Sequence, residues 1–574
     1  MHKISPINSI LIFPYKLIIR ESKFFCLLSL FNIITVLLEY RDMLFLPYRE
    51  SLKVVIYISC ALFDVYILSL FLSAIKWNLC KRIIKVILYL FASFIFIADI
   101  FCFTIYKHVI DVYLINVILQ SDQNTTYEYL LTYVFTLKTL LLCAVIIAFI
   151  LLVYKLSKFI TRISLFSYLI SFLIYIVALG FFTMVVHNNI AFSQRYMSIA
   201  RVSIGFISQL QANKSYEEIS KIMDKVNDYE CQGMSVSYKN PLSIVIILGE
   251  SCTRSHMSLY GYNLKTTPIM DKLAQDNELL VFDDVISCGN NTYTSMAQIF
   301  NFVEKDHVVL NTWYESPNII DILNRANYRT VWLTNQAGDG AMNIDTIYAS
   351  RSHESAFTTN AVKGGVSRNY DEYLFPLIDK SIENSQNNNF YVIHLEGEHP
   401  PYYLRYPDSF KKFSAHDIKG EDKNNRKKVK ASYDNAVYYT DFILGQIINR
   451  FRKQNSIIFY FSDHGEDVCL NSDYYGHTLE NQGSLQMIEI PFLVWTSKSF
   501  QETHSNEYMS LKQSIHRPLR TDYIIHTILS LAGVQTKSFN GRLSLLSSDF
   551  EEDKIRLYNK KEYKNKHTTN LITN

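Results

Sequence analysis

Several residues in the second half of the sequence are of types that bind metal ions. They are Glu250, His399, Asp463, His464 and His477. Carboxylates mixed with imidazoles are the ligand set that a zinc or manganese site requires. An acid just beyond a strand is usually a solvated loop residue or a helix cap, so no single one of these residues indicates a metal site. The hypothesis depends on whether the fold gathers them.

Short apolar runs precede most of these residues and are typical of buried strands in a parallel sheet. The runs span residues 242–249, 329–333, 390–394 and 456–462. Segments of helical character separate the runs, and this alternation predicts a C-terminal α/β domain with a mostly parallel sheet. The loops at the carboxyl ends of parallel strands lie along one edge, where sites in open α/β sheets are found. The metal-binding candidates should therefore collect at that edge.

The segment 285–300 offers a nucleophile. A β-like run meets polar residues, and Thr292 and Thr294 stand near the start of a predicted helix. The free amide hydrogens and the dipole of a helix N-terminus favour phosphate. A threonine hydroxyl is a poor nucleophile until a base or a metal removes its proton. On local evidence alone, an N-cap is the better interpretation of each threonine.

The first 187 residues differ sharply in composition from the rest. Long apolar runs lie at about 24–38, 54–74, 83–106, 130–154 and 163–186. Most approach or exceed the roughly 20 residues that a helix needs to cross a bilayer, so the sequence predicts a transmembrane domain of about five helices. Nothing at the N-terminus resembles a cleavable signal peptide, so the first helix is expected to remain as an anchor.

Basic residues predict how these helices are oriented. Lysines and arginines precede the first run and lie between the second and third and between the fourth and fifth runs. The positive-inside rule then places the N-terminus in the cytoplasm of a bacterial cell and, with five spans, everything after residue 187 in the periplasm. The net charge of +3 gives no support for nucleic-acid binding. Residues 188–240 are expected to form an amphipathic connecting segment, 241–549 the α/β domain, and 550–574 a polar, loosely ordered tail.

Three charged residues, Asp64, Asp99 and Lys138, fall within or near the apolar runs. Charges inside a membrane suggest function, such as a polar path for a headgroup. The favoured alternative is that the two aspartates pair with neighbouring helices and that Lys138 either snorkels or marks a late start of the fourth span. The connecting segment could likewise lie at the membrane surface. Beyond the membrane domain there are four cysteines, Cys231, Cys252, Cys288 and Cys469, without a CxxC pair, so a cysteine-built zinc site is not expected, and their pairing stays open.

Spaced motifs along most of the chain resemble those of one enzyme family, the membrane-anchored phosphoethanolamine transferases that modify lipopolysaccharide. These belong to the alkaline phosphatase and sulfatase superfamily, and the wording here is closest to the branch that modifies the lipopolysaccharide core. The motifs are GES at 249–251 with Arg254 and His256, SLYGY at 258–262, TTP at 266–268, SCGNNT at 287–292, WLTNQ at 332–336, GEHPPYYLRYP at 397–407, YDNAVYYTD at 433–441, and SDHGE at 462–466 with the later His477. Several motifs in the right order are far more specific than a lone SDHG.

The resemblance implies roles for individual residues. Thr292 would be the nucleophile, and its oxygen would bind zinc together with the side chains of Glu250, Asp463 and His464. The cofactor would be one zinc ion, or two, with manganese as the alternative metal. The remaining matched positions, which would hold phosphoethanolamine or a second zinc or lie near the same pocket, are His399, His477 and Asn335.

The implied reaction has two steps. Thr292 attacks phosphatidylethanolamine and diacylglycerol leaves; lipopolysaccharide then takes phosphoethanolamine from the enzyme. A lipid donor and a lipid-anchored acceptor both require an active site near the bilayer, which gives the membrane domain a purpose. Zinc lowers the pKa of a bound hydroxyl and neutralises phosphoryl charge, and phosphoryl transfer depends mostly on positioning and electrostatics.

The sequence also departs from its relatives. Those that act on lipid A usually carry proline and cysteine where this chain has Ala297 and Gln298, so the bridge that Cys288 makes there cannot form in the same way. Gly340 stands at about the place of a lysine, and Asn290 at that of the first threonine in the family's pattern. These differences favour a heptose of the core over a lipid A phosphate as the acceptor.

Two other functions remain open. One is a phosphoglycerol transferase acting on a periplasmic glycan or a teichoic-acid-like polymer, which would share the anchor, the threonine and the metal. The other is a membrane-anchored binding protein without activity. The presence of Glu250, Thr292, Asp463 and His464 together favours an enzyme, because a decayed site is expected to lose at least one of them.

Overall fold

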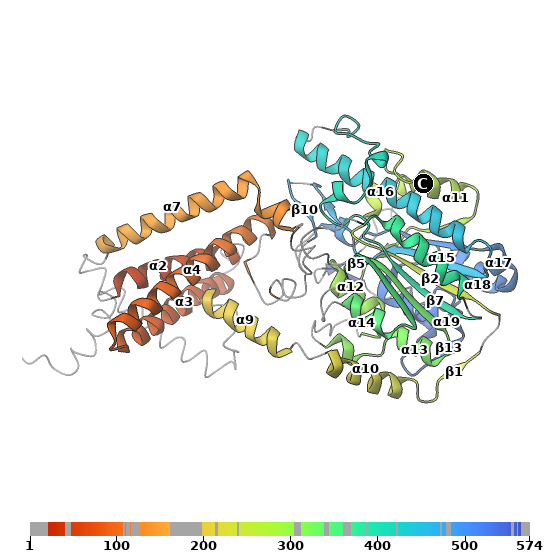
Figure 1. Cartoon of the computed structure of the whole chain (residues 1–574), viewed down its shortest axis with the longest axis horizontal. Coiled ribbons are helices and arrows are strands. Elements are labelled where there is room, and N and C mark those ends of the chain that lie inside the picture. Colours follow the sequence, from red (N-terminus) through yellow and green to blue (C-terminus); the bar gives the residue numbers. More distant parts are fainter. Residues whose placement is uncertain are drawn as a thin grey trace, which may run out of the picture. The chain divides into compact units, whose positions relative to one another are not determined.

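The computed structural model in Figure 1 describes most of the chain. The described residues are 21–40, 48–106, 109–110, 115, 127, 129–160, 198–212, 216–237, 240–303, 312–337, 344–359, 369–385, 387–420, 423–470, 473–477, 484–552, 556–558 and 561–563.

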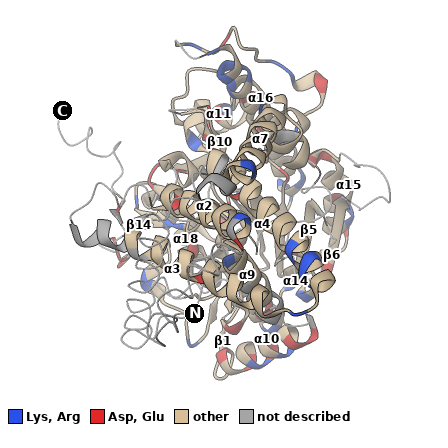
Figure 2. Ribbon diagram, turned by 90° about the vertical axis from the view of Figure 1, so that its left-hand side faces the viewer, with Lys and Arg blue, Asp and Glu red and all other residues tan. Residues whose placement is uncertain are grey.

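Apolar helices make up the described N-terminal part. They are α2 (Ser22–Glu39), α3 (Tyr48–Ala74), α4 (Asn78–Tyr106), the π-helical turn η2 (Leu130–Val134), α7 (Leu137–Ile160) and α9 (Ser198–Ala212). Within the described residues, three stretches are long and apolar enough to cross a membrane: Tyr57–Ala74, Asn78–Thr104 and Leu137–Leu156. Figure 2 shows these helices mostly in the colour of uncharged residues. Four of the five predicted spans thus coincide with helices α2, α3, α4 and α7, and the fifth, 163–186, lies outside the described residues.

Two of the three predicted intramembrane charges, Asp99 and Lys138, find structural explanations. Arg201 of α9 donates hydrogen bonds of 2.6 and 2.7 Å to the two carboxylate oxygens of Asp99 on α4, and both side chains are buried. Lys138 is exposed in the first turn of α7, as a late start of the fourth span predicts. The pairing of Asp99 with a neighbouring helix favours a structural role for this residue.

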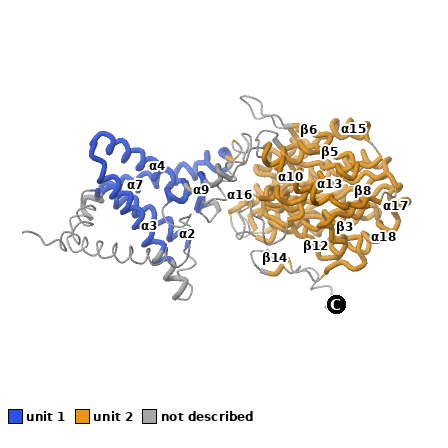
Figure 3. Tube along the Cα trace, turned by 90° about the horizontal axis from the view of Figure 1, so that it is seen from below, with its two compact units in different colours: residues 1–119, 130–212 blue, residues 120–129, 213–574 orange. Residues whose placement is uncertain are grey.

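The chain divides into two compact units (Figure 3): residues 1–119 with 130–212, and residues 120–129 with 213–574. Helix α10 (Tyr216–Glu230) belongs to the second unit. It is amphipathic, as predicted for this stretch of the connecting segment, but its apolar residues Ile219 and Met223 are buried in the core of the second unit. The membrane-surface interpretation of this helix is therefore wrong.

A seven-stranded sheet forms the centre of the second unit. Its order is β3-β11-β8-β2-β7-β5-β6. The strands are β2 (Ser243–Gly249), β3 (Leu279–Phe282), β5 (Arg329–Ala337), β6 (Glu354–Thr359), β7 (Asn389–His394), β8 (Ser456–Ser462) and β11 (Phe492–Thr496). β2 pairs in parallel with β7 and β8, whereas β11 runs antiparallel between β8 and β3. The predicted mostly parallel sheet is confirmed.

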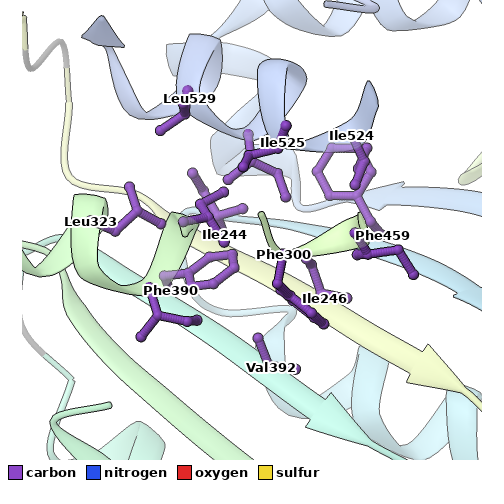
Figure 4. Packing of buried hydrophobic residues seen from close by; sticks show 14 of the residues in the cluster. Ile244, Ile246, Phe300, Leu323, Phe390, Val392, Phe459, Ile524, Ile525 and Leu529 are labelled. Carbon is purple, nitrogen blue, oxygen red and sulfur yellow. The ribbon is translucent and has the colours of Figure 1, made fainter. Parts of the chain in front are cut away.

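Helices cover both faces of this sheet. They are α11 (Pro268–Gln275), α12 (Thr292–Ile299), α13 (Ile319–Arg325), α14 (Ile344–Arg351), α15 (Phe375–Glu383), α16 (Asn424–Phe451), α17 (Lys498–Thr503), α18 (Ser505–Gln513) and α19 (Ile524–Ala532). Because successive strand residues point to opposite faces, Ile244 and Ile246 pack against α13 and α19, while Val245 and Ile247 pack towards α11, α15 and α16. Figure 4 shows the first of these cores, in which strand residues face Leu323, Ile524, Ile525 and Leu529. Burial on both faces explains why the strands are continuous apolar runs.

Short strand pairs complete the unit. They are β1 (Ser235–Val236) with β13 (Val534–Gln535), β4 (Val285–Ile286) with β12 (Leu519–Arg520), β9 (Asp467–Val468) with β10 (Tyr475–Gly476), and β14 (Leu557–Tyr558) with β15 (Lys561–Glu562). The last pair lies in the segment expected to be loosely ordered. There, buried Arg556 donates two hydrogen bonds to Asp284, at 2.8 and 2.9 Å, and the Tyr563 hydroxyl donates to Glu489 at 2.8 Å. These residues are packed, contrary to that expectation.

Candidate metal centre

The register of β2 and β8 brings two carboxylates together. Gly249 lies opposite Ser462 in the parallel pair, so Glu250 and Asp463 leave neighbouring strands at the same level. His464 follows directly. All three side chains are buried, and one potential ligand atom from each lies within 4.8 Å of the others. The structure thus gathers three of the predicted metal ligands at the carboxyl edge of the sheet.

The turn after β2 aims Glu250 into this cluster. Ser251 adopts a left-handed backbone conformation with φ of 62°, which costs energy in a residue other than glycine. From there its hydroxyl donates to Glu250 Oε1 at 2.8 Å and its backbone N–H donates to Asp463 Oδ1 at 3.2 Å. A neighbouring loop approaches closely at Gly397, where a Cβ atom would lie 2.7 Å from the Glu250 carbonyl oxygen. Backbone strain and a required glycine both serve to hold this acid.

His464 presents a free nitrogen to the cluster. Its Nδ1 lies 2.8 Å from the Gly465 carbonyl oxygen, and because a carbonyl only accepts, the ring proton is on Nδ1. Nε2 faces the two carboxylates, 3.2 Å from Glu250 Oε1 and 3.4 Å from Asp463 Oδ2, and is the nitrogen that would bind a metal ion in place of a proton. Asp463 Oδ2 is buried and has no hydrogen-bond donor among the described residues. Potential ligand atoms of three buried side chains thus face one point, as a metal site requires.

Thr292 is the first residue of α12 and borders the cluster. The N-cap of this helix is Asn291, whose side chain accepts from the Thr294 backbone N–H at 3.0 Å, so the N-cap interpretation of Thr292 is wrong. The Thr292 hydroxyl instead donates to Glu250 Oε2 at 2.9 Å and lies 3.4 Å from His464 Nε2. Its oxygen is therefore placed beside the metal-type ligands at a helix N-terminus.

Neighbouring charges set the ionisation of the cluster. Burial and the charge of Glu250 raise the pKa of Asp463 to about 7. Against the opposing effect of burial, Asp463 and Glu250 raise the pKa of His464 to about 10. Burial also favours protonated Glu250, but His464 holds the pKa of that acid well below its usual range. The carboxylates thus retain a positive charge beside them, a role that a bound cation can take over.

His477 and His399 extend the site. His477 Nδ1 lies 3.1 Å from Glu466 Oε2, and its ring centre is 4.3 Å from that of His464 and 6.2 Å from that of His399. His399 Nδ1 donates to the Pro400 carbonyl oxygen at 2.8 Å, which orients the ring. The structure therefore places both histidines next to the three-ligand cluster.

Asn335 lies behind this group. Its side chain is buried; its amide nitrogen donates to Asp371 Oδ1 at 2.8 Å, and its amide oxygen accepts from Thr358. Asp371 in turn accepts from the backbone N–H groups of Glu396 and Gly397, at 2.8 and 3.1 Å. Asn335 is thus connected to the site through the loop that carries His399.

Sequence reasoning missed Glu466. Its side chain is buried, accepts from the Tyr402 hydroxyl at 3.1 Å, and forms a second possible metal-binding group with His464 and His477. Its position in the motif 462–466, three residues after Asp463, was the available signal.

His394 was likewise not selected from the sequence. It lies buried at the end of β7, 3.2 Å from an oxygen of Asp345. That pairing joins segments far apart in the chain.

The expected absence of the family's usual bridge has a structural counterpart. The described cysteines form no disulfide with one another. The Gln298 amide nitrogen donates to the Cys288 carbonyl oxygen at 3.3 Å, so Gln298 fastens the α12 segment by a hydrogen bond. Cys288 Sγ lies 3.6 Å from the Ser295 carbonyl oxygen.

Residues 243–534, about half of the chain, match the family described as Sulfatase. The chain belongs to the sulfatase family. This confirms the sulfatase-like α/β fold expected from the motifs. The match begins at the first residue of β2 and ends just after α19, so it contains all the predicted site residues.

Relatives with established names are phosphoethanolamine transferases. The chain is 29% identical over 323 residues to phosphoethanolamine transferase EptC of Escherichia coli, a match that covers 55% of each protein. The chain therefore matches only about half the length of this relative. The zinc complex of the periplasmic domain of the E. coli EptC is similar in structure, with a TM-score of 0.51 and 28% identity over 56% of this chain and 90% of that one.

A full-length membrane protein shares the complete architecture. The integral membrane lipooligosaccharide phosphoethanolamine transferase EptA of Neisseria meningitidis matches with a TM-score of 0.61 over 92% of this chain and 98% of that one. At 18% identity this likeness shows the fold alone. It confirms the predicted combination of a helical membrane domain with a C-terminal α/β domain.

Proposed function

We propose that this protein is a zinc-dependent phosphoethanolamine transferase that takes phosphoethanolamine from phosphatidylethanolamine and transfers it to lipopolysaccharide. The observation that supports this most is the position of the Thr292 hydroxyl, 2.9 Å from Glu250 Oε2 and 3.4 Å from His464 Nε2, at the N-terminus of α12. A hydroxyl nucleophile beside metal-type ligands and free helix amides suits attack on a phosphodiester.

Four residues would hold the metal: Glu250, Thr292, Asp463 and His464. The buried Asp463 oxygen without a donor and the Nε2 of His464, which faces two carboxylates, fit a zinc ion better than they fit a purely structural cluster. Bound zinc would lower the pKa of the threonine hydroxyl and neutralise charge on the phosphoryl oxygens. Glu466 and His477 could hold a second ion in the same way, with His464 between the two groups.

The first step transfers phosphoethanolamine to the enzyme. Thr292 Oγ1 forms a bond to the donor phosphorus while the bond from phosphorus to the diacylglycerol oxygen breaks. The Thr292 proton points at Glu250 Oε2, and the departing diacylglycerol oxygen needs a proton in return. His399 and His477 are placed to hold the phosphoethanolamine group and to supply that proton, while Asn335 and Asp371 hold the loop of His399.

In the second step an acceptor oxygen forms a bond to phosphorus while the bond from phosphorus to Thr292 Oγ1 breaks. Thr292 thereby regains its hydroxyl. A heptose of the lipopolysaccharide core is the proposed acceptor in preference to a lipid A phosphate. Gln298 supports this choice, since it replaces the cysteine that lipid A-modifying relatives carry after the nucleophile. The proposed location is the bacterial inner membrane, with the N-terminus in the cytoplasm and the catalytic unit in the periplasm.

Mass spectrometry of the purified full chain tests this function. Wild type incubated with phosphatidylethanolamine and zinc should gain one phosphoethanolamine group, and the modified peptide should contain Thr292. Thr292→Ala should gain nothing, whereas Thr292→Ser, which keeps a hydroxyl, should still be modified.

An unmodified wild type that has bound zinc would contradict the proposal, as would modification of Thr292→Ala. A parallel sample with phosphatidylglycerol distinguishes the proposed function from the phosphoglycerol transferase alternative. An enzyme of that alternative kind would gain a phosphoglycerol group instead.

A further inference from the structure

A dense group of basic residues surrounds the start of α16. We name it the basic segment: the eight Lys and Arg side chains of residues 411–430, namely Lys411, Lys412, Lys419, Lys423, Arg426, Lys427, Lys428 and Lys430. The same stretch has only three acids, of which Glu421 and Asp422 lie outside the described residues. Eight basic and three acidic residues give this stretch a net charge of +5, more than the +3 of the whole chain. Blue segments gather beside the label of α16 in Figure 2.

Half of this charge is available to a partner. Lys411, Lys419 and Lys428 are exposed and make no ion pair within the described part of the chain. Lys412 is also exposed, with its ammonium group 4.2 Å from the centre of the Tyr438 ring. A run of charge is most often a solvated surface, so exposure by itself does not indicate a partner.

The position of the charge within α16 is unfavourable for folding. Lys423 is the N-cap, Arg426, Lys427 and Lys428 follow within the first turns, and the first turn contains no acid. The helix dipole places partial positive charge at this end, so basic side chains here are repelled by the helix and by one another. Asp473 compensates part of this charge, 2.6 Å from Arg426 and 3.7 Å from Lys423, and an anion near Lys427 and Lys428 would compensate more of it.

The basic segment borders the catalytic site. Arg426 Nε lies 2.6 Å from an oxygen of Asp473, in the β9–β10 hairpin four residues before His477. Further along α16, the Tyr433 hydroxyl donates to the Ser251 carbonyl oxygen and accepts from the Thr253 backbone N–H, both at 2.8 Å. The first half of α16 therefore packs under the loops that hold the metal ligands, and its basic start lies at the same edge.

We infer that the basic segment binds the phosphate groups of the acceptor, a phosphorylated lipid-anchored saccharide. The inference rests on the proposed function, since it assigns the acceptor to this edge of the site. The donor does not explain the charge, because phosphatidylethanolamine is zwitterionic and has no net charge. Lipopolysaccharide is densely phosphorylated, and the basic groups at this edge of the site complement it.

Direct binding of fluorescent lipopolysaccharide to the detergent-solubilised full chain tests this surface without requiring catalysis. The variant K411A/K419A/K428A removes three exposed lysines that have no ion pair. The matched control K221A/K498A/K512A removes three exposed lysines elsewhere in the same unit that likewise make no ion pair within the described residues. A surface lysine facing an anionic surface contributes about a factor of five, so the first variant should bind at least about tenfold more weakly at low salt. The control should bind like wild type.

Two further probes identify what is recognised. Lipopolysaccharide stripped of its phosphates should bind wild type as weakly as intact lipopolysaccharide binds K411A/K419A/K428A. Added salt should reduce the difference in lipopolysaccharide affinity between wild type and this variant. Phosphatidylglycerol micelles should compete poorly. Equal binding of both lipopolysaccharides, an unaffected lysine variant, or competition by phosphatidylglycerol at equal phosphate concentration would each overturn the inference.

The outcome is separable from that of the Thr292 experiment. If wild type forms the phosphoethanolamine adduct but the lysine variant binds lipopolysaccharide normally, the basic segment has been assigned wrongly and the proposed function stands. If binding depends on the lysines but no adduct forms, the binding surface stands and the proposed chemistry fails.

Discussion

Ser251 holds Glu250, a proposed metal ligand, from a conformation that serine does not favour. Both the Ala and the Gly variant lose the hydroxyl that donates to Glu250 Oε1. Loss of such a supporting hydrogen bond typically costs roughly 10–100-fold in metal affinity, and we expect this loss in both Ser251→Ala and Ser251→Gly. The two should differ in stability, because glycine tolerates φ of 62° and alanine does not. Chelator competition and thermal unfolding measure the two effects.

Ser255→Ala is the control for this pair, since Ser255 is exposed in the same loop and its hydroxyl contacts Thr253 and Gln486. We expect it to bind zinc as wild type does. The glycine variant should be more stable than the alanine variant by about 1 kcal/mol. Unchanged zinc affinity in both Ser251 variants would show that Glu250 is positioned without the serine.

Glu398 introduces a pH dependence next to this centre. Its side chain is fully buried, and burial raises the pKa of Glu398 to about 8, against 4.5 for an ordinary glutamate. The unfolded chain therefore loses the proton first, and folding stability should fall as the pH rises from about 4.5 to about 8, by up to about 1.4 kcal/mol per pH unit. Glu398→Gln cannot ionise and should lose this slope. Thermal unfolding with excess zinc between pH 5 and 8.5 would detect the difference, and parallel curves for the two proteins would exclude it.

Local sequence patterns were sufficient to predict those strands and helices whose form does not depend on neighbouring elements. Residues 456–462 form β8 with the predicted bounds, because an uninterrupted apolar run suits a strand buried on both faces. β11 has the same apolar character, yet its antiparallel direction follows from pairing with β3 and β8, which a single segment does not reveal. Helix α10 shows the same limit: its periodicity predicts an apolar face, whereas the partner of that face is set by the tertiary fold.

Some residues of the candidate site were likewise predictable from a local pattern, and others were not. Glu250 and Asp463 were predictable because each directly follows a strand, and the parallel register places the ends of adjacent strands at one level. Asn335 was selected from a motif, but its contact with Asp371 depends on a loop 36 positions away. Residues that support a site through distant contacts leave no local pattern.

The two units of the chain have different sources of stability. Buried Asp99 and Arg201 pair within the first unit, and the metal-type ligands lie within the second. Separate compact units with their own cores are expected to unfold separately. For the full chain in detergent we therefore predict two thermal transitions. Removal of zinc by a chelator should lower only the transition of the second unit, because a ligand at a hundredfold excess over its Kd adds about 2.7 kcal/mol.

Asp99→Ala should destabilise the first unit and not the second. It leaves Arg201 as a buried charge without its carboxylate, which typically costs roughly 3–5 kcal/mol, so only the transition of the first unit should fall. The double variant Asp99→Ala/Arg201→Ala removes the stranded charge as well and should recover part of the loss. Hydrogen exchange of peptides from α4 and from β8 assigns each transition to its unit. If the chelator and Asp99→Ala shift one common transition, the membrane and catalytic units unfold as a single cooperative structure, and stability lost at either end is transmitted to the other.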